Sequence, residues 1–238
     1  MADEADGKLV DEVVVRSLWA FPDVARAGEP FSHRVVADGV LVGWAAPGGQ
    51  LGEDVSLGAV DARRAAALAP ARARAFRTGR ALVGTLLREL VPGSSAWSVD
   101  TAPCVRCGGD HGPVAVRGVP ALASVAYADG LVVAAVASAG RASRLGVDAE
   151  ADRSDPVRAS DLARLLSVPP DATLRRWTQV EAVLKAAGLG LRVDPAQVRF
   201  RPGSARIEGT SAEYRLAEVT GPAGFVISLA WKPVARVR

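Results

Sequence analysis

Two short segments hold the side chains whose types and spacing could perform chemistry. The first, residues 146–150, reads Gly-Val-Asp-Ala-Glu and follows an apolar stretch. In a strand, alternate side chains share a face, so Asp148 and Glu150 would lie side by side while Val147 and Ala149 point the other way. Two neighbouring carboxylates repel each other unless water or a cation screens them, and their hard oxygen atoms suit Mg²⁺ or Mn²⁺. This segment alone fits both a solvated strand end and a metal site.

The second segment, residues 177–191, places three side chains along one face of a predicted helix. Trp177, Glu181 and Lys185 are four residues apart. Lysine stands out here, because only three of the 29 basic residues in the chain are lysines. An exposed helix explains the same spacing by an i,i+4 Glu–Lys pair worth roughly 0.2–0.5 kcal/mol. Gly188 likewise fits an ordinary helix C-cap, so this segment alone favours a plain surface helix.

Taken together, the two segments resemble the paired signature of the 4′-phosphopantetheinyl transferase superfamily. That signature is Gly-Val-Asp-x-Glu followed by Trp-Ser/Thr-x-x-Glu-Ala/Ser-x-x-Lys-x-x-Gly-x-Gly-Leu, and the chain matches both parts. The length of 238 residues is similar to that of the monomeric, two-half Sfp-type branch rather than the short trimeric branch. The resemblance covers residues 60–231 and includes an arginine-bearing helix and a Cys-x-x-Cys-Gly connection.

The resemblance implies Mg-dependent transfer of phosphopantetheine from coenzyme A to a serine of an apo acyl or peptidyl carrier protein, with release of 3′,5′-ADP. Asp148, Glu150 and Glu181 would hold Mg²⁺ or Mn²⁺. Glu181, directly or through water, would take the serine proton, and Lys185 would stabilise the departing 3′,5′-ADP. The coenzyme A contacts implied are Arg72, Arg80, Ser124, Tyr127 and Lys185.

Three positions depart from the family pattern. Members usually carry Ser-His in a loop before the strand that follows, whereas this chain has Tyr127 at the histidine position. The usual Gly-Lys-Pro has become Gly112-Pro113, and the basic residue often found before the helix glutamate is Val180. All three changes fall at expected coenzyme A contacts. We therefore expect the metal chemistry to be retained and the phosphate contacts to be relaxed or rebuilt with arginines such as Arg106 and Arg117.

The sequence leaves other functions open. A metal-dependent phosphohydrolase could use the same carboxylates and lysine with water as the nucleophile. A degenerate homologue could bind a carrier protein and transfer nothing. Cys104, Cys107 and His111 could supply three zinc ligands, whereas a structural zinc site normally has four. Zinc at this connection is therefore an alternative rather than an expectation.

The surrounding sequence predicts the elements that must position these residues. Valine-rich stretches at 12–19 and 33–46 predict strands, and 60–90 predicts two helices divided by Pro70. The turn-rich segment 97–119 predicts a surface connection. Further predictions are a hairpin of 131–136 with 144–150, helices at 156–166 and 174–187, and antiparallel strands at 198–207, 213–219 and 225–231.

Both halves of the chain thus read strand, helix, strand. The resemblance implies an α+β fold of two similar halves related by a pseudo-twofold axis, each a small antiparallel sheet packed with helices. We expect a flexible acidic N-terminus at 1–11 and an N-terminal half at 12–120 with the arginine helix. The C-terminal half, at 121–238, would carry the metal site and the catalytic helix.

Composition restricts the compartment and the partners. The chain is 49% hydrophobic and 23% charged, as in ordinary globular proteins. Its longest apolar run, at 130–137, is too short for a membrane helix, its start is acidic rather than signal-like, and two cysteines fit a reducing compartment. We expect a cytoplasmic monomer without a membrane partner. A net charge of +3 favours an anionic partner, while no lysine-rich tract or aromatic-basic repeat indicates nucleic acid.

Overall fold

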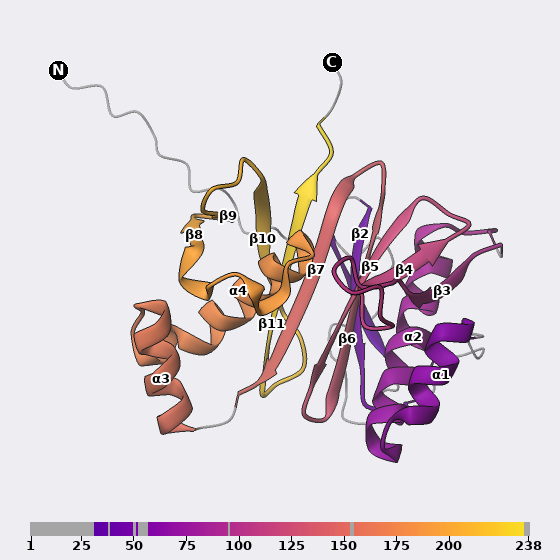
Figure 1. The fold of residues 1–238 in the computed structure, drawn as a ribbon, viewed down its shortest axis with the longest axis horizontal. Helices are drawn as coiled ribbons and strands as arrows, with labels where there is room; N and C mark the ends of the chain where they lie inside the picture. Colours follow the sequence, from indigo (N-terminus) through magenta and orange to yellow (C-terminus); the bar gives the residue numbers. More distant parts are fainter. Residues whose placement is uncertain are drawn as a thin grey trace.

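Two antiparallel sheets lie face to face at the centre of the molecule, and helices cover the outer face of each (Figure 1). This computed structural model describes residues 31–37, 39–49, 51, 57–94, 96–152 and 155–235. The predicted strand at 12–19 and the acidic segment at 1–11 lie outside these residues. The chain is an α+β protein with the layer order helix, sheet, sheet, helix. Among the described helices, none combines the length and apolar character that crossing a bilayer requires.

The first sheet is built from four strands and covered by one long helix. In spatial order its strands are β1 (Ser32–Ala37), β2 (Val40–Ala45), β6 (Leu131–Ser138) and β5 (Ala121–Ala128). Helices α1 (Ala59–Ala67) and α2 (Pro70–Leu90) follow β2, and Pro70 starts α2 as expected. Leu82, Leu86 and Leu87 of α2 are fully buried against the outer face of this sheet.

The second sheet has five strands and is covered by α4. In spatial order the strands are β7 (Ala142–Ala151), β11 (Phe225–Pro233), β10 (Glu213–Val219), β9 (Ser204–Ile207) and β8 (Val198–Arg201). The helices are α3 (Pro156–Leu166) and α4 (Thr173–Ala187), joined by the short 3₁₀ turn η1 (Pro170–Ala172). Two more 3₁₀ turns, η2 (Gly190–Arg192) and η3 (Pro195–Gln197), lead from α4 to β8. Helix α4 ends where predicted, with Gly188 in the left-handed region at φ 71°.

The two sheets are joined by an apolar layer and by one buried hydrogen bond. Val133 of the first sheet and Val147 and Leu229 of the second are fully buried in the shared core. Ser124 on β5 accepts a hydrogen bond from the backbone N–H of Val147 on β7 at 3.1 Å. This bond satisfies a backbone donor where the edges of the two sheets meet.

Three features differ from the sequence prediction. The predicted hairpin of 131–136 with 144–150 is wrong, because β6 lies between β2 and β5 and β7 pairs instead with β11. Since β6 has both edges occupied, β7 can only join another sheet. Residues 198–207 form two strands rather than one, separated by a turn at Pro202 and Gly203. Strands β5 and β6 follow residue 120 but belong to the first sheet, so the chain changes sheets at residues 139–141.

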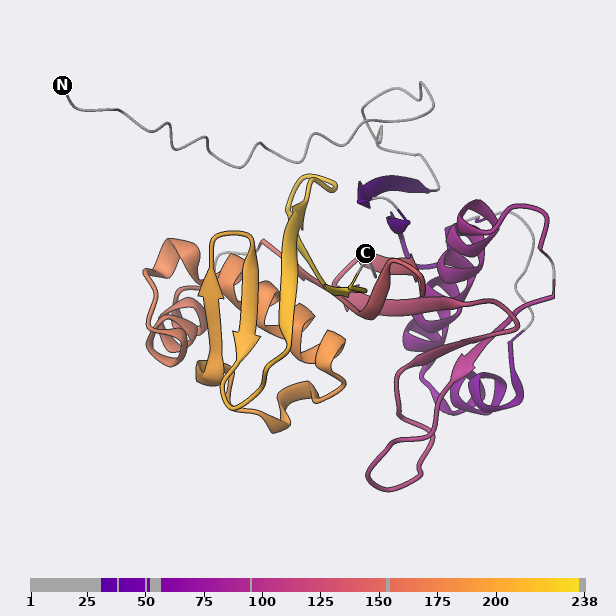
Figure 2. The ribbon, with the colours of Figure 1, turned by 90° about the horizontal axis from the view of Figure 1, so that it is seen from above.

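Ser124 and Tyr127 also differ in position, since both lie within strand β5 rather than in a loop. The predicted surface connection at 97–119 contains a two-stranded ribbon, β3 (Ser98–Thr101) with β4 (Val114–Arg117). The loop that joins these two strands projects from the body of the molecule (Figure 2). It contains the two cysteines of the chain and one of its two histidines.

Gly146 allows α4 to lie directly against β7. A Cβ atom at this position would be 2.1 Å from the carbonyl oxygen of Ala182 and 2.4 Å from the backbone nitrogen of Ala186. Both atoms belong to the backbone of α4, which cannot move aside as a flexible side chain can. The glycine that precedes the paired carboxylates therefore sets their distance from Glu181 and Lys185.

We expect Gly146→Ala to lower the free energy of unfolding by about 3 kcal/mol, because overpacking against helix backbone forces the helix away from the sheet. Urea denaturation near neutral pH measures the change. Gly140→Ala is the matched control, since its nearest atom, Ser138 Oγ, is 3.6 Å from the new Cβ. That variant should stay within about 0.5 kcal/mol of the parent. Equal stability of the two variants would contradict the close-contact argument.

Candidate active site

Strand β7 turns its acidic side chains toward α4. Val147 and Ala149 are buried in the core between the sheets, so Asp148 lies on the opposite face, as the alternation predicted. Asp148 is paired with Ser228 on the adjacent strand β11, and the hydroxyl of Ser228 is 2.8 Å from the hydroxyl of Thr178 on α4. The buried Ser228–Thr178 contact holds the helix next to the strand that carries Asp148.

Asp148 is buried and only half satisfied. It is 5% exposed. Lys185 on α4 donates from Nζ to Asp148 Oδ1 at 2.5 Å, while the lysine side chain stays 30% exposed. Asp148 Oδ2 is buried and has no hydrogen-bond partner among the described residues. An unpaired carboxylate oxygen in the interior costs free energy, which a bound ligand or an ordered water would offset.

The neighbouring charges show that the other predicted residues lie close by. Burial raises the pKa of Asp148 to about 6, with Lys185 opposing the change and Glu181 and Glu150 adding to it. Burial also raises the pKa of Glu181, against the attraction of Lys185. Glu150 forms an ion pair at 2.7 Å with Arg158 of α3. The structure therefore gathers both signature segments in one acidic site.

This site fits a hard divalent cation in its chemistry, although the carboxylates are not drawn tightly together. The three acidic side chains offer only oxygen ligands, and Asp148 Oδ2 is a buried oxygen without a partner. Among the described residues, however, the only three ligand-bearing side chains within 4.8 Å of one another are Cys104, Cys107 and His111. A shared ion would therefore require at least one glutamate side chain to rotate.

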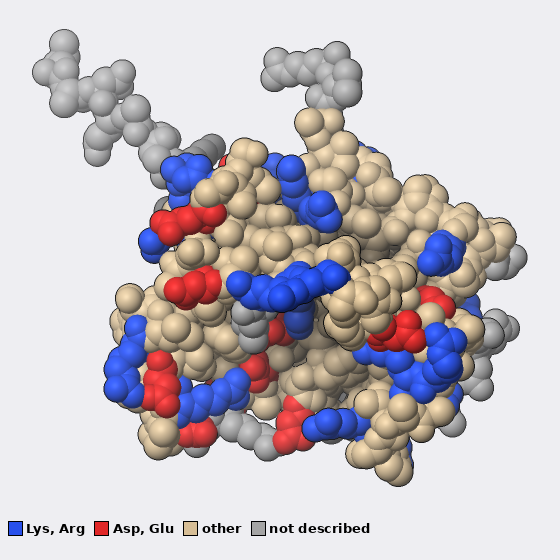
Figure 3. All heavy atoms as spheres, viewed as in Figure 1, with Lys and Arg blue, Asp and Glu red and all other residues tan. Residues whose placement is uncertain are grey.

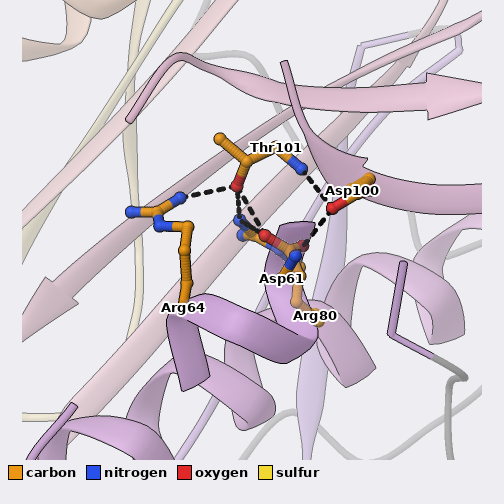
Figure 4. Close-up of polar contacts among 5 residues, drawn as sticks. All are labelled: Asp61, Arg64, Arg80, Asp100 and Thr101. Atoms are coloured by element: carbon orange, nitrogen blue, oxygen red, sulfur yellow. Dashed lines mark hydrogen bonds and ion pairs between the residues drawn. The ribbon is translucent and has the colours of Figure 1, made fainter. Parts of the chain in front are cut away.

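Arg80 lies in a buried network of polar side chains on the first half of the molecule (Figure 4). Its guanidinium donates to both carboxylate oxygens of Asp61 and, at 3.0 Å, to the hydroxyl of Thr101. Thr101 donates to Asp61 at 2.5 Å and accepts from Arg64 at 2.5 Å. Asp100 accepts from the backbone N–H groups of Asp61 and Thr101.

This network gives Arg80 a different position from the predicted phosphate contact. Arg80 is 3% exposed, and its guanidinium also lies 4.5 Å from the centre of the Phe76 ring. Its donors face protein rather than solvent. Arg72 lies exposed on the same helix. The sequence did not indicate Asp61 or the half-exposed Arg64, because both occur in an Ala- and Arg-rich segment typical of a surface helix.

Tyr127 and Ser124 have separate surroundings. Ser124 is occupied by the bond between the sheets. Tyr127 is 46% exposed, but its hydroxyl end lies against α2, since a Cβ at Gly79 would be 2.7 Å from Tyr127 Oη. Desolvation of that end raises the pKa of Tyr127, opposed by the charges of Arg80 and Arg64. Tyr127 therefore borders the buried network and also faces solvent.

A pocket of about 520 Å³ lies away from the acidic site, at the start of α4. Its walls include Arg176, Phe200 and Arg201, and Arg176 stacks on the Phe200 ring at 3.8 Å. None of the predicted site residues lines it. We place the candidate site at the carboxylates because charge, burial and an unsatisfied oxygen coincide there.

The chain matches no protein-family model and no curated protein. The two sequence segments, and the geometry that brings them together, are therefore the features of the chain that bear on its function.

Replacing Arg80 by methionine should lower the free energy of unfolding by about 3–5 kcal/mol, because Asp61 would be left as a buried, unpaired charge. Urea denaturation measures the loss. Arg72→Met, on the exposed side of the same helix, should change stability by less than about 0.5 kcal/mol. Adding Asp61→Asn to Arg80→Met should recover part of the loss. A double variant no more stable than Arg80→Met would count against the buried pair.

Asp148→Asn should stabilise the protein at neutral pH in the absence of divalent cations. A carboxyl with a higher pKa in the folded chain binds more protons when folded, so its contribution to stability falls as pH rises between the unfolded and folded pKa values. For Asp148 this window runs from the ordinary value of 3.8 to about 6. The advantage of the variant should therefore be absent near pH 4 and reach about 1–3 kcal/mol above pH 6.

Thermal or urea unfolding across this pH range, with a chelator present, measures the difference. Asp152→Asn removes an exposed carboxylate from the same end of the strand and reports the effect of net charge alone. A stability difference between Asp148→Asn and the parent that does not change with pH would contradict the burial argument.

Proposed function

We propose that this protein is a 4′-phosphopantetheinyl transferase that modifies a serine of an acyl or peptidyl carrier protein. One observation carries the proposal: Asp148 on β7 meets Lys185 of α4 within a site whose charges include Glu181 and Glu150. The two segments of the family signature are distant in sequence and converge in space. The pair of antiparallel sheets, each covered by a main helix, also supports two similar halves of the Sfp type.

In the proposed reaction, the carrier serine oxygen bonds to the phosphorus that bears phosphopantetheine. The bond from that phosphorus to the oxygen of 3′,5′-ADP breaks. Glu181 would accept the serine proton, and its raised pKa brings it closer to the pH at which a base is most effective. Lys185 uses one of its three donors on Asp148, so two remain for the oxygen atoms of the leaving phosphate.

Asp148, Glu150 and Glu181 would hold the divalent cation, which supplies neutralisation of charge on the phosphate oxygens. The buried, unpartnered Oδ2 of Asp148 supports this ligand role. Since like charges disfavour ionisation of neighbouring carboxyls, a cation would also relieve the mutual repulsion of the three groups.

The residues proposed to contact the phosphates of coenzyme A differ from those that the sequence predicted. Arg80 would act by fixing the network beneath the surface, because it is enclosed by Asp61 and Thr101. The half-exposed Arg64 and the hydroxyl of Tyr127 lie at the edge of that network and could contact a phosphate. On the face shown in Figure 3, acidic and basic side chains are interspersed over both halves, and a broad basic patch lies near the centre.

The decisive experiment incubates the protein with Mg²⁺, coenzyme A and a panel of apo carriers from fatty-acid, polyketide and nonribosomal peptide synthesis. Mass spectrometry should show phosphopantetheine added to at least one carrier, and a chelator should abolish the reaction. Free phosphopantetheine without carrier modification would instead indicate a phosphohydrolase. Carrier binding without either product would indicate a degenerate homologue.

Glu181→Gln and Lys185→Met should each lower kcat/KM for transfer by at least about 100-fold, since each removes a group that acts on a proton or a leaving group. Single-turnover mass spectrometry of the carrier measures the rate. Glu208→Gln removes an exposed glutamate that pairs with Arg199 outside the site, and should leave the rate within about twofold. If Glu181→Gln transferred phosphopantetheine at the parent rate, Glu181 would not be the group that accepts the serine proton.

A further inference from the structure

The loop between β3 and β4 gathers three side chains that metals bind. The ligand atoms of Cys104, Cys107 and His111 all lie within 4.8 Å of one another. The sulfur of Cys107 is 3.5 Å from Nε2 of His111. In a tetrahedral zinc site with Zn–S of about 2.3 Å and Zn–N of about 2.05 Å, a sulfur and a nitrogen are about 3.6 Å apart. The observed separation thus corresponds to two ligands of one ion.

The backbone holds this arrangement in place. The N–H of Gly108 donates to the carbonyl of Cys104 at 2.8 Å, and the N–H of Cys104 donates to the carbonyl of Gly109 at 2.8 Å. Gly108 has φ 71°, a conformation that glycine adopts without strain.

The base of the loop is anchored on both sides. Ala102 donates from its backbone N–H to the carbonyl of Pro113 at 2.8 Å. Asp110, the nearest acidic residue in the sequence, is ion-paired with Arg63 of α1 at 2.9 Å. This pairing turns Asp110 to α1 and leaves the cysteines and the histidine as the ligand set. Cys107 and His111 are exposed, so the remaining side of an ion would face solvent.

We propose that Cys104, Cys107 and His111 bind Zn²⁺ through two thiolates and one imidazole nitrogen, with water or an exogenous ligand at the fourth position. Binding releases the two thiol protons and leaves the imidazole neutral. The soft sulfur ligands select zinc over Mg²⁺, so this site is chemically distinct from the acidic site. The ion would fix the loop at the end of β3, the strand that supplies Asp100 and Thr101 to the buried network.

Titration of the reduced, chelator-treated protein with Co²⁺ tests the proposal directly. One equivalent should produce thiolate-to-cobalt charge-transfer absorption and the strong visible bands of tetrahedral cobalt, and one equivalent of Zn²⁺ should remove both. Cys104→Ser, Cys107→Ser and His111→Gln should each weaken the affinity for Zn²⁺ by more than about 100-fold, beyond the usual loss from an outer-shell change. His33→Gln replaces the other histidine, which pairs with Glu89, and should bind like the parent.

Thiol titration of the same sample must find two free thiols before the metal is added. Absence of the cobalt spectrum in that reduced protein, or an unchanged spectrum in Cys104→Ser, would overturn the zinc site. Loss of two hydrogen masses under air, without uptake of zinc from the reduced protein, would assign the cysteines to a disulfide instead. These readouts do not involve coenzyme A, so their outcome is separate from that of the transfer assay.

Discussion

The close approach of α4 to β7 at Gly146 is the constraint on which the acidic site depends. Without a side chain at this position, the backbone of the helix reaches the strand, and Lys185 Nζ lies 2.5 Å from Asp148. The same contact removes Asp148 from water. The attraction of Lys185 offsets only part of the free-energy cost of burying this carboxylate. Asp148 thus lowers the stability of the fold, and its Oδ2 atom has no partner among the described residues. Such a residue is typical of a site selected for function rather than for stability.

In each half, a glycine allows a helix and a sheet to pack closely, but the balance of buried charge differs between the two halves. On the first sheet, Gly79 lets the hydroxyl end of Tyr127 lie against α2, next to Arg80. There the buried positive charge of Arg80 is matched by Asp61, and the polar groups around it are paired. In the acidic site beside the second sheet, the three carboxylates outnumber the two basic side chains that pair with them, Lys185 and Arg158. The first half therefore satisfies its buried charge internally, while the second half leaves unsatisfied charge that a ligand can use.

Local sequence patterns predicted the acidic site better than they predicted the connections around it. The period of two in β7 and the four-residue spacing in α4 place Asp148 and Lys185 correctly, because both depend only on local backbone geometry. The wrong hairpin arose because turn signals do not show that β6 already has partners on both edges. The buried position of Arg80 could not be predicted from local sequence either. Its partner Asp61 is on another helix, and no periodicity links two residues that meet through tertiary packing.

If the acidic site binds a cation as proposed, binding and folding would be coupled by the same electrostatic imbalance. In the folded chain Asp148 resists ionisation because it is desolvated and because Glu181 and Glu150 are near. A bound divalent ion would reverse both effects, since it would replace lost hydration and screen the repulsion between carboxylates. A ligand that binds only the folded chain adds its binding free energy to stability. The contact at Gly146 would then be tightest when the ion is bound, because the ion joins residues of β7 to a residue of α4. The strand, the helix and the ion would form one cooperative unit, with the glycine as its steric requirement.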